Sequence, residues 1–539
     1  MPKIPVFLVA AMFAAFARAD PPVGQPKKPA FTIAKDTTFL TAPLDADGDV
    51  DYPKAINERL RQGVTPENNA SVLYSRAIGP KLDGKKRISP EYSKWLQVPE
   101  LPEEGDYFVE LGEFMRKRYD GEEPRDYGDL EDAQSECLAS AWTAKERPYL
   151  AAWLKANDKC LSLIVEGSKR SHYYLPIVWV KSKDDGSLVF GLVPHAYPCR
   201  LIARALTIRA MGNLGEGRPR ESWDDLLAVH RFSRNIGNGA SLTEFLVGLG
   251  TEGVARSAAI TFLEKSQLTS QQLKMRLHDL RQIPSQRSLA DRFDFVERVV
   301  HLQAIVDAQR AGLFSLEFAD KLSARMRGKG IAAIPDVIDL AKNPPQAPKP
   351  IDCDWDVVLR NANRWFDRLV ACLREKEHGH RNRALDQFEK DRKKLEERQE
   401  LWPTFEAIRA IPDKQTRSQV FADRVVMLLM PPMRTLLNAA DRNEQGERNT
   451  QIAFALAMYK IDQGRYPAKL DALVPKYLAQ VSGDLFSGKE LIYRPTDDGY
   501  LLYSVGVNGQ DDGGRTFGDE PIGGDDLPIR MPRIKKKTN

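Results

Sequence analysis

Three aspartates near the N-terminus have the spacing of a calcium-binding loop. Asp45, Asp47 and Asp49 lie in DADGDVDYPKAINE and would supply the first, third and fifth ligands of such a loop. However, Val50 stands where the sharp turn requires glycine, and Ile56 stands where a bidentate glutamate closes the site. Because both changes affect residues on which the geometry depends, we interpret the segment as an acidic turn.

Histidine and cysteine suggest one nucleophilic pair. His195 and Cys199 lie in the proline-bounded segment VPHAYPC, where a histidine could act as the base for a thiolate. His378 and His380 are two residues apart, and a helix would direct them to different faces, whereas helical metal pairs are four residues apart. The five cysteines are too dispersed for a zinc ribbon or a disulfide framework. We assign no catalytic residue from these patterns.

The segment GLGTEG, residues 248–253, matches the glycine pattern of dinucleotide-binding loops. Such a loop must follow a strand, so that its tight turn presents amides to a pyrophosphate. Upstream, Ser241 and Glu244 have instead the spacing that marks the start of a helix. We therefore expect these glycines to lie inside a helix and to permit close contact with a neighbouring helix.

The N-terminus and the composition indicate an exported protein. Residues 1–19 contain an early lysine, an apolar run, and the small residues Ala17 and Ala19, which is the plan of a cleaved signal peptide. The run is too short to span about 30 Å of hydrocarbon, and no later run is longer, so we expect no transmembrane segment after cleavage. The net charge of +4 argues against a nucleic-acid surface, which would require a concentrated basic stripe. The expected location is the periplasm, the cell envelope or the extracellular medium.

Apolar periodicity predicts a mainly α-helical body built from helical hairpins. Residues 202–210 and 223–230 each carry apolar side chains at helical spacing, with the turn signal GEGRP between them. His230 lies on the apolar face of the second helix, so we expect a hydrogen-bonded core histidine. One strand hairpin is expected around Asp185 and Gly186.

The chain divides at composition changes and at the proline-rich segment NPPQAPKP. The predicted fold class is mainly α, with a small C-terminal α+β module that contains an antiparallel hairpin. The expected segments are a signal peptide (1–19), a linker (20–37), an N-terminal mixed region (38–145), a helical-hairpin domain (146–342), a proline-rich linker (343–350), a charged helical region (351–440), the α+β module (441–515) and a flexible tail (516–539).

The module has the clearest local signals. Ile452, Leu456 and Tyr459 form a helical stripe, and Gly464 is placed to end that helix. RYPAKLDALVPKYL then predicts a short amphipathic helix that begins at Pro467. ELIYRP and YLLYSVG, separated by TDDG, predict the antiparallel hairpin.

Residues 448–514 resemble the soluble domain of the major pseudopilins of type II secretion. The resemblance lies in GRYP, LVPKYL, DLFSG followed by LIY, and YSVGVNGQDDGG. In that family the loop after the last strand binds calcium through side-chain and main-chain oxygens. The resemblance therefore implies a structural calcium ion at Asn508, Asp511 and Asp512, with Asp519 as a further ligand candidate; the alternative is a solvated acidic turn.

The start of the chain differs from a pseudopilin. Members of that family begin with a short basic leader and a long apolar helix that builds the filament, so we expect no filament-subunit function here. The whole chain also resembles a group of exported bacterial proteins, planctomycete in style, in LDADGDVDYPKAINERLRQGVTPENNA, RAMGNLGEGRPRESWDDLLAVHRFSR and LLYSVGVNGQDDGG. This second resemblance implies architecture only.

The sequence predicts an exported, non-enzymatic interaction or structural protein whose partner is a protein or another cell-envelope component. One alternative is a hydrolase of a cell-envelope or extracellular polymer, with its carboxylates in the helical body; another is a peripheral component of a secretion machine. A hydrolase requires a deep pocket with convergent titratable groups of shifted pKa. A binding protein requires an exposed apolar patch or a groove between helical hairpins.

Overall fold

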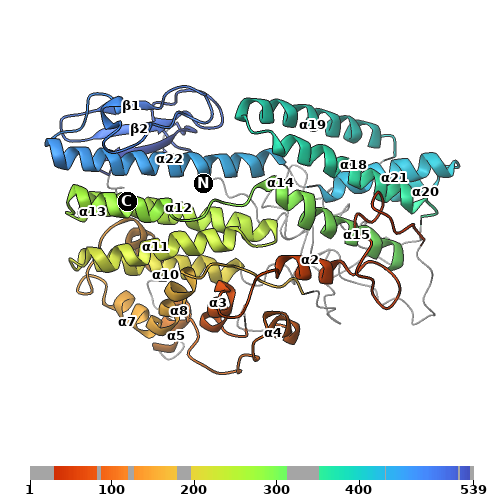
Figure 1. Ribbon diagram of the computed structural model, residues 1–539, viewed down its shortest axis with the longest axis horizontal. Helices are drawn as coiled ribbons and strands as arrows, with labels where there is room; N and C mark the ends of the chain where they lie inside the picture. Colours follow the sequence, from red (N-terminus) through yellow and green to blue (C-terminus); the bar gives the residue numbers. More distant parts are fainter. Residues whose placement is uncertain are drawn as a thin grey trace.

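The computed structural model describes residues 30–81, 87–118, 127–178, 196–311, 351–402, 404–430, 433–519 and 522–533. The expected signal peptide, the strand hairpin at Asp185 and Gly186, His195 and the linker 343–350 lie outside these residues. Most of the described chain is helical, with a small three-stranded antiparallel sheet near the C-terminus. The predicted fold class is therefore confirmed. Figure 1 shows the long helices running along the long axis, with the sheet at one end.

Short helices with local caps build the N-terminal region. Asp51 accepts a hydrogen bond from Lys54 N and so begins the first of them, while Asn69 caps the second through Ser71 N. The bounds of these helices are α2 Tyr52–Leu60, α3 Ala70–Ile78, α4 Pro90–Leu96, α5 Leu111–Arg118, α6 Tyr127–Ala139, α7 Pro148–Ala156 and α8 Asp158–Ser168.

The helical body consists of four longer helices, α10 Ala196–Gly215, α11 Pro219–Gly237, α12 Leu242–Lys265 and α13 Ser270–Arg281. Ser241 and Glu244 form the expected capping box at the start of α12. The GLGTEG segment therefore lies inside a helix, as predicted. At Gly248 the backbone of α12 approaches α11 so closely that a Cβ atom would lie 2.5 Å from Gly237 N.

The region after residue 288 forms a second helical layer. Its helices are α14 Leu289–Arg292, the π-turn η1 Phe293–Glu297, α15 Arg298–Ala311, α18 Trp355–Arg374, α19 His378–Gln399, α20 Phe405–Arg409, α21 Lys414–Leu429 and α22 Met433–Gln463. Helix α18 buries one apolar face against α21, whereas α19 is largely solvated, as its charge predicts. Residues 30–37, which we expected to belong to a linker, are packed into this layer, with Phe31 and Thr37 buried.

Helix α22 connects the two layers. Its first turns bury Met433 and Leu437 among α18 and α19 side chains, and its later turns place Ile452 and Phe454 in the core of the helical body. The Phe454 ring meets Trp223 edge-to-face, with 5.7 Å between centroids. The predicted boundary between residues 440 and 441 is therefore wrong, because it falls inside one continuous helix (Figure 1).

The sheet packs on the outer side of α22. Strands β1 Ile492–Pro495, β2 Tyr500–Ser504 and β3 Leu527–Met531 pair antiparallel in that order, so the predicted hairpin is confirmed. Two expectations fail here. The short helix predicted from Pro467 is only a 3₁₀ turn, Leu470–Leu473, and the expected flexible tail contributes β3, whose Ile529 is buried in the core.

Candidate functional site

The loop between β2 and β3 contains all four residues implied as calcium ligands. Glycines with positive φ at Gly506, Gly509, Gly513 and Gly514 fold this loop into successive tight turns. At Gly506 a Cβ atom would also meet the Asp525 main chain, so the start and the end of the loop lie against each other.

The structure brings Asn508 and Asp512 together with a residue that the sequence analysis missed, Asp525. The Asn508 side-chain amide donates to Asp512 Oδ2 at 3.0 Å, and Asn508 N donates to Asp525 Oδ2 at 2.9 Å. Asp512 Oδ2 also accepts from Asp525 N at 2.7 Å. Arg442 of α22 pairs with the other Asp525 oxygen, which ties the loop to the helix.

The other two predicted ligands, Asp511 and Asp519, stabilise turns of the loop. Asp511 Oδ1 accepts from Gly513 N and from the Tyr503 hydroxyl, each at 2.8 Å, and these hydrogen bonds lower the pKa of Asp511. Asp519 Oδ2 accepts from Thr516 N at 2.7 Å. Both carboxylates therefore stabilise local backbone conformation.

Asp526 is the second residue that the sequence analysis missed. Its side chain is 1% exposed, and Oδ2 accepts from Gly514 N at 2.6 Å. Among the described residues Oδ1 has no hydrogen-bond partner, and burial raises the pKa of this carboxyl. The signal was the pair Asp525-Asp526 directly before β3, which a boundary at residue 515 excluded.

Oxygen donors at this loop suit calcium better than a softer metal. Asp512, Asp526 and the Asn508 amide supply hard oxygens, and the glycine turns leave main-chain carbonyls close by. Across the described ranges, no group of three or more His, Cys, Asp or Glu side chains is arranged to hold a metal ion. Calcium binding would therefore rely on amide and carbonyl oxygens beside the two carboxylates.

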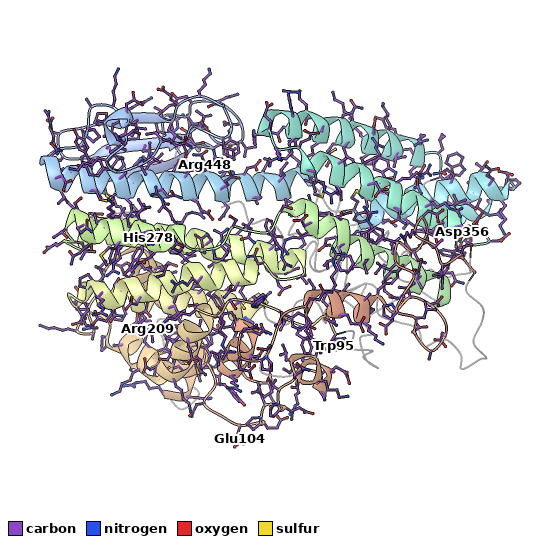
Figure 2. All side chains as sticks on the ribbon, viewed as in Figure 1. Trp95, Glu104, Arg209, His278, Asp356 and Arg448 are labelled. Atoms are coloured by element: carbon purple, nitrogen blue, oxygen red, sulfur yellow. The ribbon has the colours of Figure 1, made fainter. Side chains whose placement is uncertain are left out.

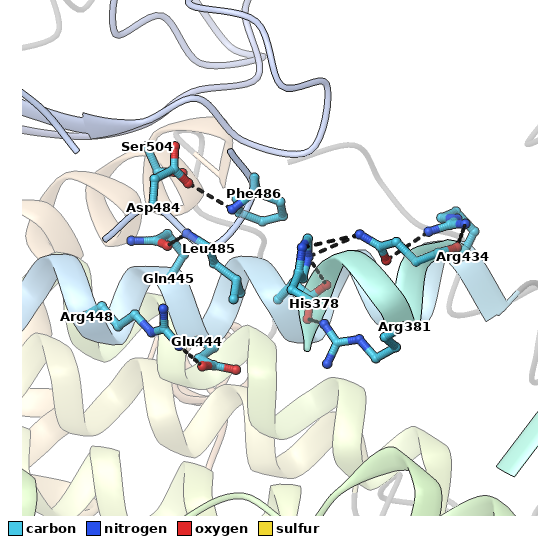
Figure 3. Close-up of polar contacts among 12 residues, drawn as sticks. His378, Arg381, Arg434, Glu444, Gln445, Arg448, Asp484, Leu485, Phe486 and Ser504 are labelled. Atoms are coloured by element: carbon cyan, nitrogen blue, oxygen red, sulfur yellow. Dashed lines mark hydrogen bonds and ion pairs between the residues drawn. The ribbon is translucent and has the colours of Figure 1, made fainter. Parts of the chain in front are cut away.

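Buried polar side chains hold the module on α22. Gln445 is fully buried, and its Oε1 accepts from Leu485 N at 2.7 Å (Figure 3). Its Nε2 donates to Asn449 Oδ1 at 2.7 Å. Asn449 in turn donates to the Leu527 carbonyl of β3 at 3.0 Å. Asp484 accepts from the Ser504 hydroxyl at 2.8 Å, which joins the preceding loop to β2.

The opposite side of α22 meets an ionic network of the helical body. Arg234 pairs with Glu447 at 2.6 Å, and Arg256 donates to Asn443 Oδ1 at 2.6 Å. His230 Nδ1 lies 2.7 Å from Glu252 Oε1, which confirms a hydrogen-bonded core histidine. Burial opposes ionisation of Glu252, but the adjacent cations outweigh it and the pKa of this carboxyl is lowered.

The remaining candidates from the sequence have structural roles. Asp45 Oδ1 accepts from Asp47 N at 3.0 Å and Asp49 N at 2.9 Å, so this segment is the acidic turn that we expected. His378 contacts Asp441 at 3.1 Å. Cys199 is buried, and burial raises the pKa of its thiol, which disfavours a nucleophilic thiolate.

Among the described residues, no helix has the length and apolar character needed to cross a membrane. No family model, curated protein or solved structure matches this chain.

Proposed function

We propose that the chain is an exported, non-enzymatic interaction protein whose β2–β3 loop binds a protein partner of the cell envelope. The observation that carries this proposal is a pair of large apolar side chains on the loop: Phe517 is 69% exposed and Ile522 is 67% exposed. Exposed apolar side chains gathered on one loop are typical of interaction sites, where they serve as anchors.

The support beneath the loop favours recognition by a preformed surface. The hydrogen bonds of Gln445 and Asn449 fix the module on α22, and the Arg442–Asp525 ion pair fixes the loop itself. A loop that is already ordered loses little conformational entropy on binding. The same loop carries Asp511 and Asp519, which favour a partner with an apolar pocket and a basic rim.

A structural calcium ion in the loop belongs to this proposal. The buried, unpartnered Asp526 Oδ1 and the adjacent Asp512 support it, because a cation would compensate both carboxylates. When bound, the ion would hold the two ends of the loop together. It would supply no reactive chemistry.

A peripheral position in a secretion machine is the narrower form of the proposal. The observation that favours it is the packing of a small antiparallel sheet and an acidic loop on one long helix, α22. This arrangement agrees with the pseudopilin resemblance of residues 448–514.

Site-specific photocrosslinking tests the interaction. The full chain would carry p-benzoylphenylalanine at Phe517 and be irradiated in envelope preparations of the producing cells. Met275 on α13, which is 53% exposed, provides a control position outside the β2–β3 loop. We expect a discrete adduct from position 517 that weakens in an Ile522→Asp variant. Identical adducts from both positions, or none from position 517, would reject the proposal.

A further inference from the structure

The outward side of helix α19 carries four exposed cations, Arg383, Lys390, Lys393 and Lys394. The lysines follow Arg383 by seven, ten and eleven residues, and this helical spacing places all four on one side of the helix. The apolar side chains of α19 face the other way, toward α18 and α21. Figure 1 shows α19 along one edge of the molecule. We call these four cations the basic face of α19.

Each carboxylate between residues 383 and 394 has an arginine partner. The pairs are Asp386 with Arg434 of α22, Asp391 with Arg368 of α18, and Glu389 with Arg392 of α19. Among the described residues, no carboxylate is left to pair with Arg383, Lys390 or Lys393. Lys394 shares Asp391 with Arg368, at a distance of 3.4 Å. The basic face therefore has a surplus of positive charge, although α19 also carries acidic residues.

The charges of α19 are placed against the helix dipole. Acidic side chains stabilise the N-terminal end of a helix, and basic side chains stabilise its C-terminal end. Here the first turn contains no acidic residue, and Glu377 at the N-cap makes no capping hydrogen bond. At the C-terminal end, Glu396 and Glu397 outnumber Arg398. Because this arrangement costs helix stability, it indicates that the charge pattern is kept for a purpose other than folding.

The composition of the basic face favours a membrane surface over a protein partner. Three of its four cations are lysines, which act as point charges and require no fixed geometry. None of the large apolar side chains that are exposed in the described part of the chain lies on α19. Protein interfaces depend on apolar and aromatic anchors and are depleted in lysine, so this face offers them little.

The dimensions of the face lead to the same partner. From Arg383 to Lys394 the cations extend over about 16 Å along the outside of a single helix. A small anion requires donors that converge on one point, whereas cations spread along a helix suit a surface of repeated negative charges. Without apolar anchors, such contact is electrostatic and does not insert into the bilayer.

We propose that the basic face of α19 binds the headgroups of anionic lipids at a membrane surface. The helix would lie along the surface, and each cation would add a modest attraction. The ion pairs with Arg368 and Arg434 join α19 to α18 and α22, so this contact would orient the whole body on the membrane. The inference goes beyond the partner proposed for the β2–β3 loop and does not depend on it.

Vesicle co-sedimentation of the full chain tests the inference. The probes are vesicles of phosphatidylglycerol mixed with phosphatidylcholine, and vesicles of phosphatidylcholine alone. We expect the chain to sediment with the mixed vesicles at low salt and to be released at high salt, because salt screens exposed charges. Equal binding to both kinds of vesicle would overturn the proposal. Retention on immobilised polyglutamate without vesicle binding would also overturn it, in favour of an acidic protein.

Matched triple variants locate the contact. The first combines Arg383→Gln, Lys390→Gln and Lys393→Gln and should weaken binding to the mixed vesicles by about tenfold or more. The control carries the same change of charge at three exposed lysines outside α19: Lys155→Gln, Lys169→Gln and Lys274→Gln.

The control should bind like the unmodified chain, since its substitutions lie on or beside α7, α8 and α13. Both triple variants should keep the melting temperature, because the replaced side chains form no ion pair with a described carboxylate. Equal loss of vesicle binding in the two variants would show a general effect of net charge. That result, or unchanged binding in the first variant, would overturn the proposal.

Discussion

Asp526 carries a buried carboxylate oxygen that the described protein atoms leave without a partner. If calcium compensates it together with Asp512, the ion stabilises the folded state by mass action, by about 2.7 kcal/mol at a hundredfold excess over Kd. We therefore expect millimolar calcium to raise the melting temperature over that in chelator by on the order of 2 °C or more. Differential scanning calorimetry measures the shift.

Paired variants locate the calcium effect. An Asp512→Ala, Asp526→Asn double variant should lose the shift. Asp519→Asn should retain it, because this carboxylate serves the turn at Thr516. If calcium does not shift the melting temperature of the unmodified chain, or shifts that of the double variant equally, the loop is an acidic turn without a calcium site.

We predict that the stability of the fold depends on pH through Glu297, independently of any metal ion. Burial raises the pKa of this carboxyl from its ordinary value of 4.5 to about 7, although Leu242 N donates to it and Arg292 lies nearby. Between pH 4.5 and 7 the unfolded chain has lost a proton that the folded chain keeps, so stability falls as the pH rises through this window. The loss is on the order of 3 kcal/mol.

The Glu297→Gln variant removes this dependence and keeps an acceptor for Leu242 N. Urea unfolding should show the variant to be more stable than the unmodified chain at pH 8 and similar to it at pH 5. Glu221→Gln, at an exposed position in the first turn of α11, is the control and should change little at either pH. A destabilised Glu297→Gln protein at pH 8 would contradict the argument.

At the scale of the elements, the close crossing of α11 and α12 depends on Gly248 and not on the nearby Gly250. A Cβ atom at Gly248 would lie 2.5 Å from Gly237 N and 2.7 Å from the Ser233 carbonyl oxygen, so the helices would have to separate. A Cβ atom at Gly250 would meet nothing within 4 Å. We expect Gly248→Ala to destabilise by about 2 kcal/mol or more. Gly250→Ala should stabilise by up to about 1 kcal/mol. If the close crossing is real, denaturant unfolding should show changes of opposite sign in the free energy of unfolding for the two variants.

The polar attachment of the module to α22 also predicts a local effect. Gln445→Met would leave Leu485 N and Asn449 Oδ1 without a buried partner, at a cost of about 1–3 kcal/mol. Hydrogen exchange should accelerate in residues 485–505 and stay unchanged in α10. Glu444→Gln, one residue away, removes only an exposed ion pair with Arg448 and should change stability by less than about 0.5 kcal/mol (Figure 3). Uniform acceleration across the chain would show that Gln445 is not a local attachment.

Local patterns explain which elements the sequence revealed. The capping box at Ser241, the hairpin of β1 and β2 and the amphipathic helices depend on residues close together in the chain, so their spacing is visible in the sequence. Strand β3 was missed because its partner, β2, lies across a long glycine-rich loop. Asp525 and Asp526 were missed for the same reason, since they meet Asp512 and Gly514 only when β3 pairs.

At the scale of the whole molecule, distant segments meet in ways that local spacing does not encode. Thr32 N donates to Asp356 at 2.7 Å, across 324 residues of sequence, at the end of the molecule where α18 begins (Figure 2). A cleft of about 920 Å³ is formed at this junction of the N-terminal segment with α18, α19 and α21. Its lining could therefore not be predicted from the sequence alone.

Helix α22 makes the C-terminal module part of the body. Its buried residues Ile452, Phe454 and Leu456 share one apolar cluster with Trp223 of α11 and with Ile529 of β3. An isolated module would expose this apolar face to water, and this exposure would cost about 25 cal/mol of free energy per Å² of apolar surface. The module should therefore depend on the body for its stability, unlike an independently folding domain.

This dependence predicts that residues 433–539 do not fold alone. Circular dichroism and a proton–nitrogen correlation spectrum of that fragment should show weak helicity and poor dispersion. Adding residues 30–432, produced separately, should restore a dispersed spectrum, because the Trp223 side of the apolar cluster and the Arg234 and Arg256 contacts to α22 become available again. In the full chain, the module and the helical body should melt in one transition. A fragment that folds by itself, with a dispersed spectrum, would instead show that the module is a separable domain. The order of the proposed partner site would then depend on the contacts within the β2–β3 loop alone.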